Sequence, residues 1–132
     1  MRETKVLLIE SARKNGISFA DSLARRYDVH IAHSGTQAIS LAVEKHPDVI
    51  LFDAVSLRTS GDRICSRLRS SLGLMPIIHI RPKEAKSRES AADVLLSPPF
   101  TPRKLINRIE RFATPAEGSN LEVGPFVLNL EQ

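Results

Sequence analysis

The run Val-Ile-Leu-Phe-Asp at positions 49–53 is a stretch of apolar residues that ends abruptly in one carboxylate. A continuous apolar run of this length, preceded by Pro47, is typical of a strand that is buried on both faces of a parallel sheet. In open α/β sheets, ligands bind outside the carboxyl ends of the strands. We therefore expect Asp53 to lie at the edge of the sheet where such a fold carries out its chemistry.

Short apolar runs alternate with segments of helical spacing along most of the chain. This alternation predicts an α/β fold, with a doubly wound, five-stranded parallel sheet. The segment 81–90 is polar and weakly patterned, so we expect a loop with at most a short helix there. Strands are predicted at 5–9, 29–32, 49–53, 76–80 and 94–96, and helices at 17–27, between 34 and 47, at 62–72 and at 102–112.

Polar residues at the predicted helix starts indicate how each helix is capped. Ser34 is a candidate N-cap with Gln37 as its capping-box partner, and Asp62 is a candidate N-cap for the next helix. Thr101 followed by Pro102 opens the last helix. The helical spacing predicts that Ala24, Ala38, Val43, Cys65, Leu68, Leu105 and Ile109 face inward.

The composition is that of an ordinary globular domain. The 132 residues are 42% hydrophobic and 26% charged, with a net charge of +4 and a sequence pI of about 9.6. The net positive charge is compatible with a regulator that is associated with nucleic acid, and equally with a solvated basic surface. Cys65 is the single cysteine, which excludes an internal disulfide and fits a reducing compartment. Without an apolar run long enough to span a membrane or a signal peptide, we expect a soluble, cytoplasmic protein.

The last part of the chain differs in composition from the rest. Residues 113–120 are rich in Pro, Gly, Ser and Asn, which predicts a linker. Residues 121–132 follow as a tail with the pattern of a strand or hairpin. The four histidines lack metal-ligand spacing, and no glycine-rich nucleotide-binding loop is present.

Several features in order resemble the receiver domains of two-component response regulators. The first strand ends in Glu10, the third ends in Asp53, and Gly61 follows at the family's spacing. The segments Pro76-Ile77-Ile78 and Ala91-Ala92-Asp93…Pro99-Phe100 are similar to the family's fourth strand and to its Gly-Ala-Asp…Lys-Pro-Phe signature. The resemblance implies a receiver-like domain over residues 1–112 with a flavodoxin-like fold, strand order 2-1-3-4-5. That order would place Glu10 beside Asp53.

The tail carries a second resemblance. Residues 121–129 look like the first strands of an OmpR/PhoB-type winged-helix domain. This implies a transcription regulator that dimerises and binds DNA through a C-terminal domain outside this chain. The alternative is a tail strand that packs against its own domain.

The resemblance also implies a phosphorylation site from which this sequence departs. In the family, a histidine kinase supplies a phosphoryl group to the aspartate at the position of Asp53, and Mg²⁺ is held by acidic residues and a backbone carbonyl. Glu10, Asp53 and the Val55 carbonyl match that metal site. Ser11, however, stands in place of a second acid, so we expect Mg²⁺ to bind weakly or not at all.

Three further positions of the family pattern are altered. Arg81 occupies the position of a Thr or Ser, Pro98 that of a Lys, and Leu95 that of an aromatic switch residue. Either Asp53 still accepts phosphate, or it is a retained carboxylate that has lost this chemistry. Arg81 could pair with Asp53 or Glu10 and replace the missing cation, or it could point to solvent.

The sequence thus predicts a receiver-like signalling domain with a degenerate phosphoacceptor pocket, not an enzyme, because no second catalytic group accompanies Asp53. The alternatives are a conventional phospho-accepting receiver and a stand-alone protein-interaction module. The resemblance also implies a cis Pro98–Pro99 peptide bond, because the bond before the proline of the family's signature is typically cis. Because the segment between Arg81 and Pro98 is shorter than is usual in the family, we also expect a shortened helix there and an altered dimer face.

Overall fold

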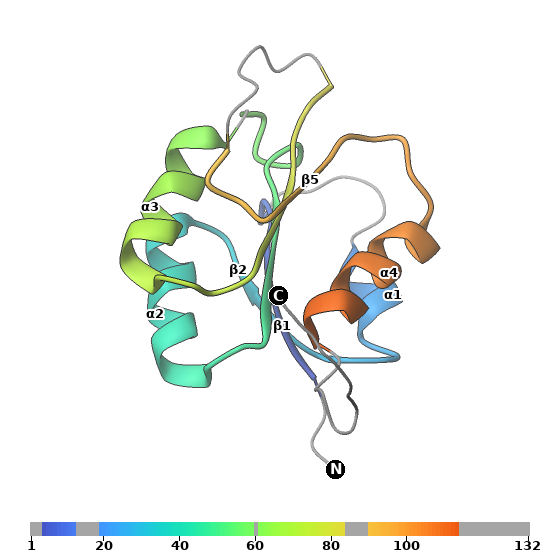
Figure 1. Cartoon of the computed structure of the whole chain (residues 1–132), viewed down its shortest axis with the longest axis horizontal. Coiled ribbons are helices and arrows are strands. Elements are labelled where there is room, and N and C mark those ends of the chain that lie inside the picture. The colour runs from blue at the N-terminus through green and yellow to red at the C-terminus, as the bar shows by residue number, and fades with distance from the viewer. Residues whose placement is uncertain (1–3, 13–18, 60, 84–89, 114–132) are drawn as a thin grey trace, which may run out of the picture.

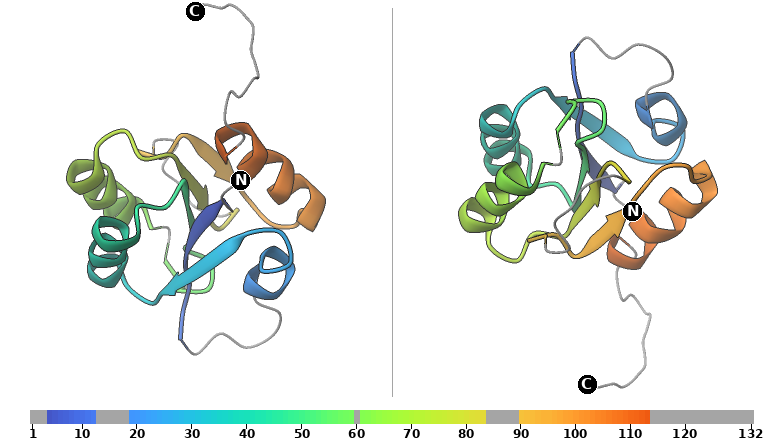
Figure 2. Two further views of the ribbon diagram at one scale, coloured as in Figure 1. Left: turned by 90° about the horizontal axis from the view of Figure 1, so that it is seen from below. Right: turned by 90° about the horizontal axis from the view of Figure 1, so that it is seen from above.

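The protein is an α/β domain built on one parallel sheet with helices on both faces (Figure 1). The computed structural model describes residues 4–12, 19–59, 61–83 and 90–113. Helices α1 and α4 lie side by side on one face of the sheet, and α2 and α3 cover the other (Figure 2). The strands are β1 (Lys5–Ile9), β2 (Asp28–Ala32), β3 (Val49–Asp53), β4 (Ile77–Ile80) and β5 (Val94–Leu96), and the helices are α1 (Phe19–Leu23), α2 (Gly35–Lys45), α3 (Asp62–Leu72) and α4 (Pro102–Ala113).

The strand order is β2-β1-β3-β4-β5, and every neighbouring pair is parallel. The predicted doubly wound sheet of flavodoxin-like order 2-1-3-4-5 is therefore confirmed. β3 lies at the centre, and all five of its residues are buried. This explains why its sequence is a continuous apolar run rather than an alternating one.

Side chains of the sheet alternate between two hydrophobic cores, one on each face. Val6, Leu8 and Leu51 pack beneath α1 and α4, together with Leu105 and Ile109 of α4. On the other face, apolar side chains of β1, β3 and β4 pack against α2 and α3, where they contact Ala38, Ala42, Cys65 and Leu68. The inward positions predicted for α3 and α4 are confirmed.

The helix caps agree with the sequence except in two details. The Ser34 hydroxyl accepts the Gln37 N–H as predicted, but the Gln37 side chain accepts from the N–H of His33 rather than of Ser34. Thr101 caps α4 by accepting the Lys104 N–H. The prediction that Asp62 is the N-cap of α3 is wrong, because the cap is the preceding glycine and Asp62 is the first helical residue.

Two predicted core positions are also wrong. Val43 on α2 is 63% exposed, because the inward stripe of that helix consists of Gly35, Ala38 and Ala42. Ala24 is exposed because α1 ends at Leu23, and a turn then leads to β2. Burial of Leu23 and Tyr27 on either side of this turn fixes the path of the chain.

A single arginine of α3 holds the segment that precedes β5. The Arg69 guanidinium forms an ion pair with Asp93 at 2.8 Å, and the same Asp93 oxygen accepts the N–H of Ile77 at the start of β4. Most of the segment 81–90, for which a loop with at most a short helix is predicted, lies outside the described residues, and residues 91–93 are bends. Arg69 also donates to three backbone carbonyls, those of Gly73, Met75 and Ala91.

The described residues contain no helix that is long and apolar enough to cross a membrane. The predicted linker and tail, residues 113–132, fall almost entirely outside the described residues. Their assignment therefore stays a prediction.

Tyr27 joins the α1–β2 turn to α4. Its hydroxyl group donates to the carboxylate of Glu110, and only 4% of the residue is exposed. Burial, followed by the hydrogen bond and the negative charge of Glu110, raises the pKa of Tyr27 to about 12. The folded protein therefore holds this proton more tightly than the unfolded chain, in which the pKa is close to 10.

We predict that Tyr27→Phe lowers the free energy of unfolding at pH 7 by about 2 kcal/mol, the usual contribution of a hydrogen bond to a charged group. Because the pKa is raised by folding, this contribution is complete below pH 10 and is lost as the pH rises through about 12. Urea denaturation of both proteins between pH 7 and pH 12 should show the difference shrinking over that interval. Parallel pH curves for the two proteins would contradict the assignment.

Candidate functional site

Three charged residues lie in one row at the carboxyl edge of the sheet. Glu10 directly follows β1, Asp53 ends β3, and Arg81 directly follows β4. The register pairs Ile9 with Phe52 and Asp53 with Ile80, so the three strands end at nearly the same level. Asp53 consequently lies between Glu10 and Arg81 in the strand order, as the resemblance implied for the two acids.

All three residues of the row are buried. Asp53 is 1% exposed, Glu10 6% and Arg81 9%. Charged groups are rarely this buried unless hydrogen bonds or opposite charges compensate for the lost hydration. The hydrogen bonds and ion pairs at this edge of the sheet therefore determine how the three charged side chains can be arranged.

Ser56 ties the ends of β1 and β3 together. Its backbone N–H donates to the Asp53 carboxylate at 3.2 Å, and its hydroxyl group donates to the Asp53 carbonyl at 2.9 Å. The same hydroxyl oxygen accepts the backbone N–H of Ser11 at 3.0 Å. Ser11, which stands where the family has a second acid, thus contributes its backbone to the positioning of the Asp53 loop.

The backbone of Glu10 is fixed by β2 and by the loop that follows it. The N–H of Glu10 donates to the carbonyl of Ala32 at 3.0 Å. Its carbonyl lies 3.0 Å from Nδ1 of His33, and because a carbonyl can only accept, Nδ1 carries the proton. Glu10 is therefore held at the edge through its main chain.

Arg81 forms an ion pair with Asp62, the first residue of α3. The guanidinium Nη1 and the Asp62 carboxylate oxygen are 3.0 Å apart, and the two side chains are 10% and 27% exposed. This contact joins the end of β4 to the start of α3 across the edge of the sheet. The predicted pairing of Arg81 with Asp53 or Glu10 stays a prediction.

Gly61 allows α3 to begin this close to the sheet. Its φ of 78° is left-handed, and a Cβ atom there would lie 2.7 Å from Phe52 and from Ala54 and 2.9 Å from His79. Glycine is therefore required by the backbone conformation and by the close approach together. The glycine of the receiver-like pattern has a clear structural reason in this chain.

A buried polar cluster lies beneath Gly61, between β4 and α3. His79 stacks on Phe52 with ring centroids 5.0 Å apart, and its Nδ1 lies 2.9 Å from the Ser90 hydroxyl oxygen. That oxygen is 3.6 Å from Sγ of Cys65. Burial raises the pKa of the Cys65 thiol, although the hydrogen bond with Ser90 acts in the opposite direction. Cys65 is thus the small core residue that the sequence predicts.

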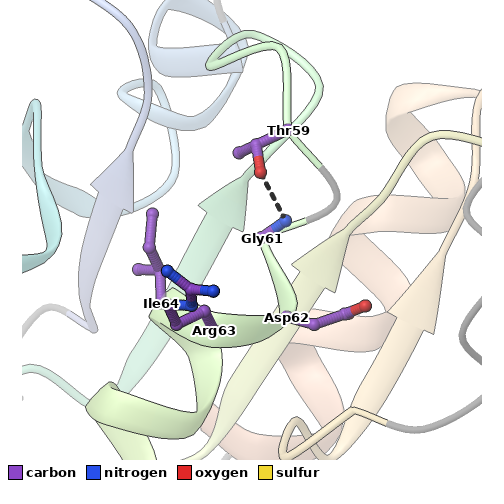
Figure 3. Close-up of a pocket in the computed structure, with 5 residues that line it drawn as sticks. All are labelled: Thr59, Gly61, Asp62, Arg63 and Ile64. Carbon is purple, nitrogen blue, oxygen red and sulfur yellow. Dashed lines mark hydrogen bonds between the residues drawn. The ribbon is translucent and has the colours of Figure 1, made fainter.

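An open pocket of about 470 Å³ lies beside the start of α3 (Figure 3). The Gly61 N–H donates to the Thr59 hydroxyl at its rim, and the Asp62 side chain extends away from Arg63 and Ile64. The pocket is lined by Thr59, Gly61, Asp62, Arg63 and Ile64. Asp62 therefore lines the pocket and also forms the ion pair with Arg81 of the buried row.

The residues that match the family's metal site, Glu10, Asp53 and Val55, offer two carboxylates and one backbone carbonyl. The Val55 carbonyl already accepts the Arg58 N–H at 3.0 Å, although a carbonyl has a second lone pair. No group of three or more His, Cys, Asp or Glu side chains in the described ranges is arranged to hold a metal ion. Glu10, Asp53 and Val55 could hold Mg²⁺ only with several water molecules as further ligands.

An uncharged residue follows β5 at the position where the resemblance implies a lysine. Pro98 stands there, and the Pro98–Pro99 peptide bond is cis, the geometry that the sequence predicts. Leu95, at the position of the aromatic switch residue, is 39% exposed.

Two residues of the site were missed in the sequence. Ser56 has a local signal, because a serine three residues after an aspartate is typical of a turn closed by the aspartate side chain. The sequence suggests only a helix cap for Asp62, and nothing in the local sequence indicates that Arg81, the residue after β4, pairs with it. That contact follows from the register of β3 with β4 and from the close start of α3.

No protein-family model matches the sequence. The structure is similar to solved receiver domains. A response regulator receiver modulated diguanylate cyclase from Pelobacter carbinolicus has a TM-score of 0.69 and 26% sequence identity, covering 83% of this chain and 91% of that chain. A Francisella response regulator receiver domain has a TM-score of 0.70 and 22% identity, with coverages of 84% and 97%.

A third similar structure is the receiver domain of a sensor histidine kinase from Pseudomonas aeruginosa PAO1, which has a magnesium ion coordinated in its active site cleft. Its TM-score is 0.66 and its identity 22%, and the match covers 86% of this chain and all (100%) of that chain. The fold is therefore that of response regulator receiver domains of the CheY-like type.

We predict that Gly61→Ala lowers the free energy of unfolding by about 3 kcal/mol or more, because backbone strain and overpacking each cost about 1–3 kcal/mol. Gly73→Ala is the matched control, since Gly73 also has a positive φ but a Cβ atom there would meet nothing within 4 Å. Chemical denaturation should rank Gly61→Ala as clearly more damaging. Equal losses would show that the close approach to Phe52 and His79 is unimportant.

We predict a coupling free energy of about 1–2 kcal/mol between Arg81 and Asp62 in a double-mutant cycle of Arg81→Met and Asp62→Asn, because the ion pair is largely buried. The exposed pair of Lys45 and Glu44, with 3.7 Å between the charged atoms, serves as the control and should give less than about 0.5 kcal/mol. Urea denaturation of the single and double variants measures both values. A coupling free energy near zero for Arg81 and Asp62 would show that their ion pair does not stabilise the fold.

Proposed function

We infer that this chain is the receiver domain of a two-component response regulator that controls transcription, and that conventional phosphorylation of its aspartate has been lost. The observation that carries the proposal is the row Glu10, Asp53 and Arg81. The acceptor aspartate and one acid are retained at the receiver positions, while a buried arginine paired with Asp62 stands where the family has a hydroxyl group.

Transfer of a phosphoryl group to an aspartate requires compensation of the negative charge that collects on the phosphoryl oxygens. Mg²⁺, when bound to Glu10, Asp53 and the Val55 carbonyl, would supply part of that compensation. The lysine cation and the hydroxyl donor of the family are replaced by Pro98 and Arg81. A phosphodonor would also have to reach a carboxylate that is 1% exposed.

Arg81 is a permanent cation at this edge, and its charge is engaged by Asp62. Its ion pair with Asp62 connects the end of β4 to the start of α3, and α3 is held against the sheet at Gly61. An ion pair of this kind holds the edge in one arrangement without a phosphoryl group. Regulation would then follow from dimerisation or from binding of a partner rather than from a change in the charge of Asp53.

The partners of such a domain follow from the same proposal. A histidine kinase could bind without transferring phosphate, and two copies could form a homodimer with an altered dimer face. The resemblance of residues 121–129 to a winged-helix domain supports DNA binding beyond this chain, and the absence of disulfide pairing supports a cytoplasmic location.

A conventional receiver is the second candidate, favoured by the retention of both Glu10 and Asp53 at the carboxyl edge. Two carboxylates with a nearby carbonyl are a sufficient protein contribution to many Mg²⁺ sites. This candidate requires Asp53 to become accessible and Arg81 to tolerate a phosphoryl group at its side.

We predict that acetyl phosphate with Mg²⁺ does not phosphorylate the wild-type chain, as measured by intact mass. A variant that restores the family's groups, Ser11→Asp with Arg81→Thr and Pro98→Lys, should gain the mass of one phosphoryl group, because it regains an acid, a hydroxyl donor and a cation. Addition of Asp53→Asn to the restored variant should abolish that gain.

The two controls separate the candidates. Phosphorylation of the wild-type chain that is lost in Asp53→Asn would establish the conventional receiver and refute the proposal. If the restored variant folds, as judged by its circular dichroism, but still accepts no phosphate, the position of Asp53 is not that of a phosphoacceptor.

A further inference from the structure

The outer face of α4 carries an unusual concentration of positive charge. Arg103, Lys104 and Arg111 are exposed and Arg108 is half-buried, while Leu105 and Ile109 on the opposite side of the helix enter the core. Lys104 and Arg108 are separated by four residues and Arg108 and Arg111 by three, so their side chains are neighbours on the helix surface. We call Arg103, Lys104, Arg108 and Arg111 the basic face.

The start of the basic face contradicts the electrostatic preferences of an isolated helix, whereas Arg111 lies in the last turn, where a positive charge is favourable. Arg103 and Lys104 lie in the first turn, which contains no acidic residue, although the helix dipole favours negative charge there. Like charges at these spacings also repel. Residues that break several local rules at once without a gain in stability are expected at functional surfaces.

Within the described part of the chain, the side chains of the basic face make neither a hydrogen bond nor an ion pair. The acidic residue of α4, Glu110, is engaged by the hydroxyl group of Tyr27. Two further arginines, Arg25 and Arg26, are exposed in the turn that follows α1, directly before Tyr27. Helix α1, which these two arginines follow in the chain, lies beside α4 (Figure 2).

Among the described residues, α1, α4 and the turn after α1 present none of the large exposed apolar side chains that anchor protein partners. The large hydrophobic side chains that are exposed in the described ranges are Ile31, Val43, Val55, Leu74 and Leu95, and none of these lies on α1 or α4. Protein interfaces depend on buried aromatic and aliphatic anchors, and helices that lie on membranes insert an apolar face. Interfaces with nucleic acid are polar and strongly positive, and arginine suits the geometry of phosphate.

We propose that the basic face of α4 binds the phosphate backbone of duplex DNA without reading its sequence. A duplex is favoured over a single strand because single-strand binding relies on exposed aromatic rings for stacking, and Phe100 and Phe112 of this region are packed against the core. The choice of DNA over RNA rests on the proposed function, a transcription regulator. Contacts with phosphate would add to affinity and orient the receiver domain on DNA that a second domain recognises.

The test is a fluorescence anisotropy titration of a labelled random-sequence DNA duplex with the full 132-residue chain at several salt concentrations. The variant Lys104→Gln with Arg108→Gln should weaken binding at low salt by about tenfold or more, and should reduce the slope of log K against log salt by about 2. The matched control is Arg63→Gln with Arg67→Gln on α3, which removes the same charge from the other side of the sheet and should leave most of the binding intact.

A second readout shows that the variants are folded. Because removal of neighbouring like charges relieves repulsion, the unfolding temperature of the α4 variant should be equal to or higher than that of the wild type. If the α3 and α4 variants weaken DNA binding equally, the affinity depends only on net charge, and the proposal is overturned. Tighter binding to poly-glutamate or to anionic lipid vesicles than to DNA would assign the face to an acidic protein or a membrane instead.

This test is independent of the phosphorylation experiment. Loss of binding in the α4 variant supports the basic face whether or not Asp53 accepts phosphate. Conversely, if the wild-type chain does not bind DNA, the proposal that the basic face binds DNA is refuted. That result would not affect the proposal that phosphorylation of Asp53 has been lost.

Discussion

The burial of charge at the carboxyl edge of the sheet is the constraint on which the site depends. The register ends β1, β3 and β4 together, and this places Glu10, Asp53 and Arg81 where water hardly reaches them. An uncompensated buried charge costs several kcal/mol, so each of these residues has to be matched by the residues around it. Asp53 accepts the N–H of Ser56, and Arg81 is paired with Asp62. The loops and helix starts at this edge are therefore arranged around charges that the sheet itself imposes.

Gly61 connects this electrostatic requirement to the packing of the fold. Asp62 can reach Arg81 because α3 begins directly against Phe52 and His79, and only a residue without a side chain allows that approach. On the same helix, Arg69 binds three carbonyl groups and Asp93, and so fixes the segment that enters β5. α3 thus organises both the charged row at its start and the entry to β5 near its end. A shift of this helix would disturb both places together.

The parts of the structure that follow from local pattern could be predicted from the sequence. The apolar run that ends at Asp53 and the opening of α4 at Pro102 agree with the structure because spacing and cap chemistry act over a few residues. For α3, the spacing predicts the helix but the cap residue is wrong. The helical spacing of Val43 predicts a core position, but the fully buried residues of α2 are Gly35, Ala38 and Ala42, and Val43 lies outside that stripe. The ion pair of Arg81 with Asp62 joins residues that are far apart in the sequence. It can be predicted only when the register of β3 with β4 and the position of α3 are known.

The distribution of positive charge around the end of β5 differs between the carboxyl edge of the sheet and the outer surface. Pro98, which follows β5, brings no charge to the edge, and the buried cation is Arg81, which directly follows β4. The chain then passes Phe100, which stacks on Phe19 of α1, and enters a helix whose first turn is occupied by Arg103 and Lys104. A buried arginine that is already paired offers little to an incoming phosphoryl group, whereas exposed cations on a rigid helix are well placed for an anionic partner. The same loop therefore separates a pocket whose cation is already engaged from a surface whose cations face solvent.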